Sequence, residues 1–107
     1  MNQPDLHHEG PLTVELVRGL MDKLKVALDE IVAFVPPDSD VEWVFCKNNW
    51  AETLQYAGVS CAAILTKLEC EIEYRLEEDH KRIDIILCIL RDYEAAKAKG
   101  FERGNNV

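Results

Sequence analysis

Basic residues are scarce in this chain. Its 107 residues include 12 Lys and Arg against 20 Asp and Glu, which gives a net charge of −8. No basic cluster is longer than the pair Lys81-Arg82. Proteins that bind nucleic acids or anionic membranes need a basic surface. The composition therefore argues against direct contact with either, and it permits a partner protein with a basic surface.

Long apolar runs are also lacking. No stretch reaches the ~18 apolar residues that a transmembrane helix needs. The first ten residues, MNQPDLHHEG, contain neither the basic start nor the apolar segment of a secretory signal. We therefore expect a cytoplasmic protein that makes no membrane contact and whose cysteines stay reduced.

Residue patterns that support catalysis or metal binding are missing as well. The four cysteines, Cys46, Cys61, Cys70 and Cys88, are spaced by 15, 9 and 18 residues, without the close pairs of structural zinc sites. There is no glycine-rich phosphate loop and no nucleophile in a recognisable setting. We predict no catalytic residue, no cofactor and no bound metal. A small enzyme built on a distant Cys–His pair remains an alternative.

Glycine and proline are few, at 5 and 4 residues. An all-β fold needs more turn residues than this, whereas apolar residues recur here at helical spacing. The sequence predicts an all-α single domain over residues 11–100, between flexible tails at 1–10 and 101–107. Three main helices are expected at about 11–35, 49–77 and 80–99, and the last two should form a helical hairpin.

The expected boundaries follow from local signals. Pro11 suits the first position of a helix, and Gly100 suits the residue after one. Asn49 is expected to cap the second helix, so that residues 41–45 form coil or a single helical turn, with Trp43 and Phe45 folded over the core. Asp79 is expected to cap the third helix. One continuous helix over residues 49–99 remains open, because the apolar phase persists across the expected break.

The segment IDIILCIL, residues 83–90, carries one charge in eight positions. On a helical wheel its apolar arc spans about twice the ~100° of a surface helix. The first face holds Ile83, Ile86, Leu87 and Leu90. The second face holds Ile85 and Ile89, with Tyr93 between the two faces. The preceding helix carries a second apolar line of its own, formed by Val59, Ala63, Cys70 and Tyr74.

Two interpretations fit this surplus of apolar surface. Helix 80–99 is either covered by the rest of its own chain, or one of its faces meets another protein. We favour the second in so small a domain, and a two-fold homodimer is the first assembly to expect. The predicted interface residues are Cys70, Tyr74, Ile85, Ile89 and Tyr93.

Residues 43–99 resemble a known family. An aromatic entry segment leads into a helix of the form L-x-x-A-x-x-x-x-A-x-x-L, here Leu54, Ala57, Ala62 and Leu65. In this layout, and in size, acidity and helical content, the chain is similar to the small QslA-like antiactivators of LuxR-type quorum-sensing regulators. The resemblance implies a non-enzymatic inhibitor that binds a bacterial transcriptional regulator and blocks its dimerisation or DNA binding.

An acidic segment supports a different hypothesis. Residues 69–79 hold six acids and one base, with Glu69, Glu73 and Glu77 at intervals of four. Such a run is most often a solvated helix face. The alternative is an acidic nucleic-acid mimic, or a phage-type inhibitor of a basic protein. The sequence leaves open the partner, the regulated pathway and whether the apolar face serves the self-dimer or the partner.

Overall fold

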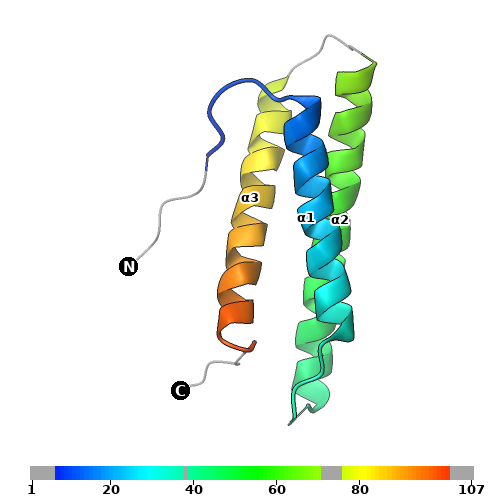
Figure 1. The fold of residues 1–107 in the computed structure, drawn as a ribbon, viewed down its shortest axis with the longest axis vertical. Coiled ribbons are helices and arrows are strands. Elements are labelled where there is room, and N and C mark those ends of the chain that lie inside the picture. Colours follow the sequence, from blue (N-terminus) through cyan, green and yellow to red (C-terminus); the bar gives the residue numbers. More distant parts are fainter. Residues whose placement is uncertain (1–6, 38, 71–75, 102–107) are drawn as a thin grey trace.

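The computed structural model describes residues 7–37, 39–70 and 76–101. These residues form three helices, α1 (Val14–Ala33), α2 (Val41–Glu69) and α3 (Leu76–Ala98), and no strand. The all-α prediction is confirmed. The helices lie side by side, with α1 and α3 running in one direction and α2 in the other (Figure 1).

Helix α1 begins at Val14, three residues after the expected start. The Thr13 hydroxyl oxygen accepts a hydrogen bond from the Leu16 N–H at 3.1 Å, so Thr13 is the N-cap and Pro11 lies in the approach to the helix. The helix ends at Ala33, before Pro36-Pro37, and Phe34 is already extended. One stripe of α1 is buried, formed by Val17, Leu20, Leu24, Ala27 and Ile31.

The start of α2 corrects the expected boundary. The helix begins at Val41 because the Asp40 carboxylate accepts a hydrogen bond from the Trp43 N–H at 2.9 Å. Asn49, the expected cap, therefore lies inside the helix. Trp43 covers the core as expected, with 3% of its surface exposed, whereas Phe45 is 66% exposed and does not fold over the core. The earlier start places Trp43 inside the helix, where its side chain is buried. An N-cap at Asn49 would instead leave residues 41–45 outside the helix.

Helices α2 and α3 are separate. Helix α2 ends at Glu69 with Cys70 as its C-cap, and α3 begins at Leu76. Asp79 is thus not the N-cap but a fully buried residue in the first turn of α3. Its Oδ1 accepts a hydrogen bond from Arg82 at 2.8 Å, and the Lys67 Nζ lies 3.8 Å away. This buried carboxylate connects the end of α2 to the start of α3.

The C-terminal end of α3 has the expected glycine stop. Gly100 adopts a φ of 66°, its N–H donates to the Lys97 carbonyl, and the Phe101 N–H donates to the Ala96 carbonyl. These two bonds form a Schellman motif, in which glycine suits the left-handed position. Phe101, which was expected in a tail, is only 7% exposed. Its ring centroid lies 5.3, 5.8 and 5.7 Å from those of Phe34, Trp43 and Tyr93.

Residues before α1 were expected in a tail, but the described part of this segment is bound to α3. The segment reaches from the start of α1 across to α3 (Figure 1). The His8 N–H donates to Asp84 Oδ1 at 2.9 Å, and His7 Nδ1 lies 2.7 Å from Asp84 Oδ2. The His80 Nε2 lies 3.0 Å from the Gly10 carbonyl oxygen. These bonds secure α3 at its N-terminal half.

Most of the helix packing is between α1 and α2, whereas α3 approaches both of them at far fewer positions. The core nevertheless receives residues from all three helices. Because α3 lies against its neighbours only in part, hollows flank it on both sides.

Candidate protein-interaction site

The apolar residues of α3 divide among three directions. Ile83 and Ile86 face the core and are fully or almost fully buried. Leu87 and Leu90 are only half-buried and line a groove toward α1. Ile85 and Ile89 line a hollow toward α2. The wide apolar arc of this helix is thus only partly used by the core.

The hollow between α2 and α3 has a volume of about 320 Å³. Tyr56 from α2 and Ile85 and Ile89 from α3 line it, and Val59 follows Tyr56 by one helical turn. The exposed fractions are 72% for Tyr56, 67% for Val59 and 59% for Ile85. We call these four residues the α2–α3 face. Large apolar side chains exposed together in this way usually mark a contact with another molecule.

The predicted interface residues do not all lie together. Ile85 and Ile89 belong to the α2–α3 face, and Cys70 is exposed at the end of α2. Tyr74 lies outside the described residues. Tyr93 is fully buried and points into the core, where its ring meets that of Trp50 edge-on at 5.5 Å.

The burial of Tyr93 has a clear chemical consequence. Its hydroxyl donates to Glu30 Oε1 at 3.1 Å. Burial, reinforced by this carboxylate, raises the pKa of Tyr93 well above its usual value. Tyr93 therefore stabilises the monomer and offers no surface to a partner.

Tyr56 is a site residue that the sequence reasoning missed. It precedes Val59 by three positions and so extends by one turn the apolar line Val59, Ala63 and Cys70 of α2. The helical periodicity contained this signal. Its phenolic tip makes Tyr an ambiguous residue on a wheel, since it suits a core edge as well as a surface.

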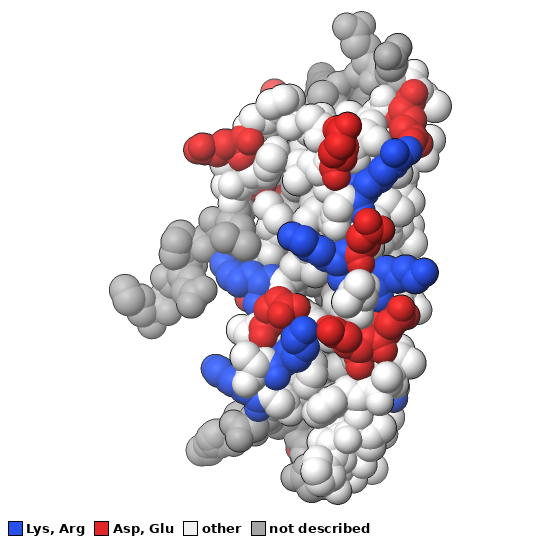
Figure 2. Space-filling model, in the orientation of Figure 1, with Lys and Arg blue, Asp and Glu red and all other residues white. Residues whose placement is uncertain are grey.

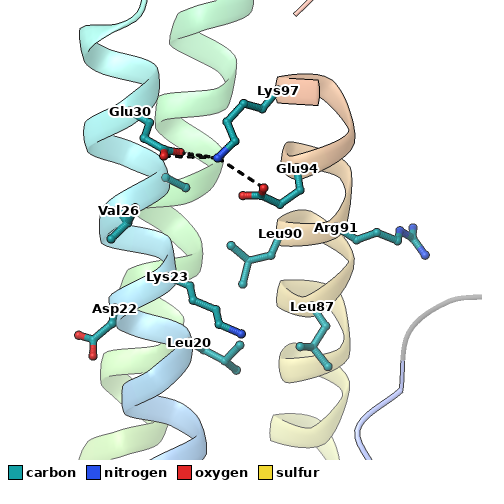
Figure 3. A pocket seen from close by; sticks show the side chains of 11 residues that line it. Leu20, Asp22, Lys23, Val26, Glu30, Leu87, Leu90, Arg91, Glu94 and Lys97 are labelled. Carbon is teal, nitrogen blue, oxygen red and sulfur yellow. Dashed lines mark hydrogen bonds and ion pairs between the residues drawn. The ribbon is translucent and has the colours of Figure 1, made fainter. Parts of the chain in front are cut away.

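A larger groove lies between α1 and α3, with a volume of about 570 Å³ (Figure 3). Leu87 and Leu90, from the first apolar face of the helix, pack in part against the core and also line this groove. Its apolar lining residues are Leu20, Val26, Ala27, Leu87 and Leu90, and its charged ones are Asp22, Lys23, Glu30, Arg91, Glu94 and Lys97. Charged side chains of both signs gather over this side of the molecule (Figure 2). We call this feature the α1–α3 groove.

One further group of apolar residues is exposed at the start of α2. Val41, Val44 and Phe45 share one helix face and are 69%, 52% and 66% exposed. This end of the molecule is largely uncharged in Figure 2. We call these three residues the end patch.

Several cysteine and histidine side chains have structural surroundings. Within residues 7–37, 39–70 and 76–101, no group of three potential ligands could hold a metal ion. Burial raises the pKa of the Cys61 thiol to about 11, which suppresses its reactivity. His7, His80 and Asp84 attach the N-terminal segment to α3.

The acidic segment is only partly described. Glu69 pairs with Arg18 across α1 and α2, Glu77 is exposed in the first turn of α3, and Glu73 lies outside the described residues. The pairing of Glu69 reduces the charge of the expected acidic ladder.

In the described part of the chain, no helix is both long enough and apolar enough to cross a membrane. The described surface carries the α2–α3 face, the α1–α3 groove and the end patch. No protein-family model, no curated protein and no solved structure matches this chain.

Proposed function

We propose that the protein is a non-enzymatic inhibitor that binds a LuxR-type transcriptional regulator through the α2–α3 face. Binding there would block dimerisation of the regulator or its contact with DNA. The observation that carries the proposal is the exposure of Tyr56 and Ile85, each by more than half, around a hollow, with the exposed Val59 one helical turn from Tyr56. The nature of the partner comes from the resemblance of residues 43–99 to small antiactivators.

The composition of the face suits competition with a protein's own dimer contact. A dimer interface depends on a few apolar and aromatic residues at its centre. Tyr56 offers a large ring with a polar tip, and the hollow beside it can accept a side chain of the partner. The net charge of −8 favours approach to a DNA-binding protein, since such a protein carries a basic surface.

A purified LuxR-type regulator, loaded with its signal molecule, provides the test. Titration calorimetry would measure complex formation, and fluorescence anisotropy of labelled promoter DNA would measure release of the regulator. We expect binding of the protein and loss of the regulator–DNA complex. Ile85→Asp should weaken the complex by at least tenfold, because the interface would bury a carboxylate in place of an apolar side chain. Ile85 is 59% exposed, so the substitution should leave the fold intact.

Val44→Asp is the matched control, because it places the same charge on the exposed end patch, on α2. It should bind the regulator as the unmodified chain does. If the protein forms no complex with the regulator, the proposed function is refuted. If Ile85→Asp binds as tightly as the unmodified chain, the α2–α3 face is not the binding site. A complex that dissociates steeply with added salt would instead support the acidic-mimic hypothesis, since apolar contacts depend little on screening.

A further inference from the structure

We propose that the α1–α3 groove binds a second copy of this chain, in a two-fold dimer whose helices run antiparallel across the interface. The inference is independent of the proposed function, since it uses a different side of α3. Leu87 and Leu90 form the α3 wall of the groove and are only half-buried. Val26 stands on the α1 rim with 57% of its surface exposed.

The directions of the helices define what fits the groove. Helices α1 and α3 run parallel to each other (Figure 1). A helix that lies between them and runs antiparallel to both would give the alternating layout of a four-helix bundle. A two-fold axis perpendicular to the helices reverses the direction of every helix in the second copy. A second copy therefore presents helices in the required direction.

In Figure 3, Glu30, Glu94 and Lys97 lie together at one end of the groove, and Lys23 lies nearer the other end. One end carries Glu30 and Glu94 with Lys97 between them, whose Nζ lies 3.1 Å from Glu30 and 3.4 Å from Glu94. Two acids and one base make that end net negative.

Lys23 points into the groove nearer the other end, whereas Asp22 and Arg91 point away from it (Figure 3). Arg91 also pairs with Asp92 outside the groove at 3.1 Å. Within the described residues, Lys23 and Asp22 form no ion pair. Lys23 is therefore available to a carboxylate of another molecule.

The two-fold arrangement places Lys23 of each copy against the acidic end, Glu30 and Glu94, of the other. The complementary contact is then made twice, as an isologous interface requires. A uniformly acidic or basic partner would match only one end. The exposed Val26 of each copy would contact Leu87 and Leu90 in the groove of the other copy. The same surface of the chain therefore provides both sides of the contact. This self-complementarity is what selects a second copy as the occupant.

Sedimentation velocity of the full chain over a concentration series gives the first test. We expect a species of twice the 12.2 kDa chain mass at high concentration. Val26→Glu should raise the dimer dissociation constant by at least tenfold, with an unchanged helical circular dichroism spectrum. Val44→Glu on the end patch is the matched control, with a similar exposure of 52%, and should dimerise normally.

A charge-reversal pair tests the orientation. Lys23→Glu and Glu94→Lys should each weaken the dimer, and the double variant should recover at least part of the loss, because every pair is reversed together. A monomer at all concentrations would overturn the proposal. If Val44→Glu dissociates the dimer and Val26→Glu does not, the interface lies at the end patch and the proposal is overturned. If the double variant dimerises no better than the single variants, the two-fold arrangement is overturned.

The two interfaces are separable by variants. Ile85→Asp should lose regulator binding and still form the dimer, whereas Val26→Glu should lose the dimer and still bind the regulator. If Val26→Glu also proves unfolded by circular dichroism, Lys23→Glu serves in its place, because Lys23 is exposed at the rim.

Discussion

Phe101 packs at the C-terminal end of α3 while its own backbone adopts a left-handed conformation, with φ at 59°. Its ring contacts three other aromatic rings and is 7% exposed. Truncation of a buried Phe to Ala costs ~3–5 kcal/mol. Because Phe101 lies at the edge of the bundle, where the remaining rings can shift, we expect Phe101→Ala to cost about 3 kcal/mol. That is a large part of the roughly 5–15 kcal/mol of a small domain.

Phe101→Gly separates the ring from the backbone. A residue other than glycine in the left-handed region costs about 1–2 kcal/mol, and glycine avoids this cost. Against this, glycine loses about 0.4–1 kcal/mol through the greater freedom of its unfolded chain. The net expectation is that Phe101→Gly is more stable than Phe101→Ala by about 0.5–1 kcal/mol, the reverse of the usual order of these two residues.

Urea denaturation followed by tryptophan fluorescence measures both differences, because Trp43 packs directly against Phe101. All variants are compared at one protein concentration, since any self-association adds to the apparent stability. Phe45→Ala is the control. Phe45 is 66% exposed, so its loss should change the free energy of unfolding by less than about 0.5 kcal/mol. A cost below about 1 kcal/mol for Phe101→Ala, or a higher stability of Phe101→Ala than of Phe101→Gly, would refute the reasoning.

Two predictions concern pH. Burial raises the pKa of Tyr93 above its usual value of 10.0, so its stabilising effect is present below that pH and is lost as the pH rises further. Absorbance titration should show one tyrosine that ionises only as helicity is lost, and this late ionisation should be absent from Tyr93→Phe. If every tyrosine ionises near the usual pKa while the protein is folded, the prediction is wrong. The hydrogen bond from the His8 N–H lowers the pKa of Asp84 below its usual 3.8. The ionised carboxylate therefore stabilises the fold above pH 3.8, and this stabilisation is lost as the pH falls through the lowered pKa. The stability deficit of Asp84→Asn, measured in urea, should therefore be largest at neutral pH and shrink in acid, and a deficit independent of pH would show that the charge is irrelevant.

The helices could be predicted from the sequence because their apolar periodicity is strong. The stop of α3 at Gly100 was predictable for a different reason, since glycine readily adopts the left-handed backbone that ends many helices. The start of α2 was not, because Asp40 and Asn49 are both good caps and the choice depends on where Trp43 is buried. A capping signal is local, whereas the burial of Trp43 depends on the distant Phe34 and Phe101.

The candidate site was predicted only in part. A helical wheel shows that the apolar side chains of residues 83–93 point in more directions than one core face requires. It cannot show which of these directions a neighbouring helix covers. Ile85 and Ile89 lie on a partly exposed face, whereas Tyr93 points inward toward Trp50 and Glu30. The α1–α3 groove depends on the spacing of two helices more than sixty residues apart in the chain, as in the Glu30–Lys97 pair. Periodicity carries no information about that spacing.

Helix α3 forms one wall of both the α1–α3 groove and the hollow beside Ile85. A rigid shift of this helix toward α2 would narrow one recess and widen the other. Occupancy of the two recesses is then linked, and the linkage is reciprocal: whatever one guest does to the affinity for the other, the other does in return. Such a movement of α3 would couple two opposite sides of a chain of 107 residues.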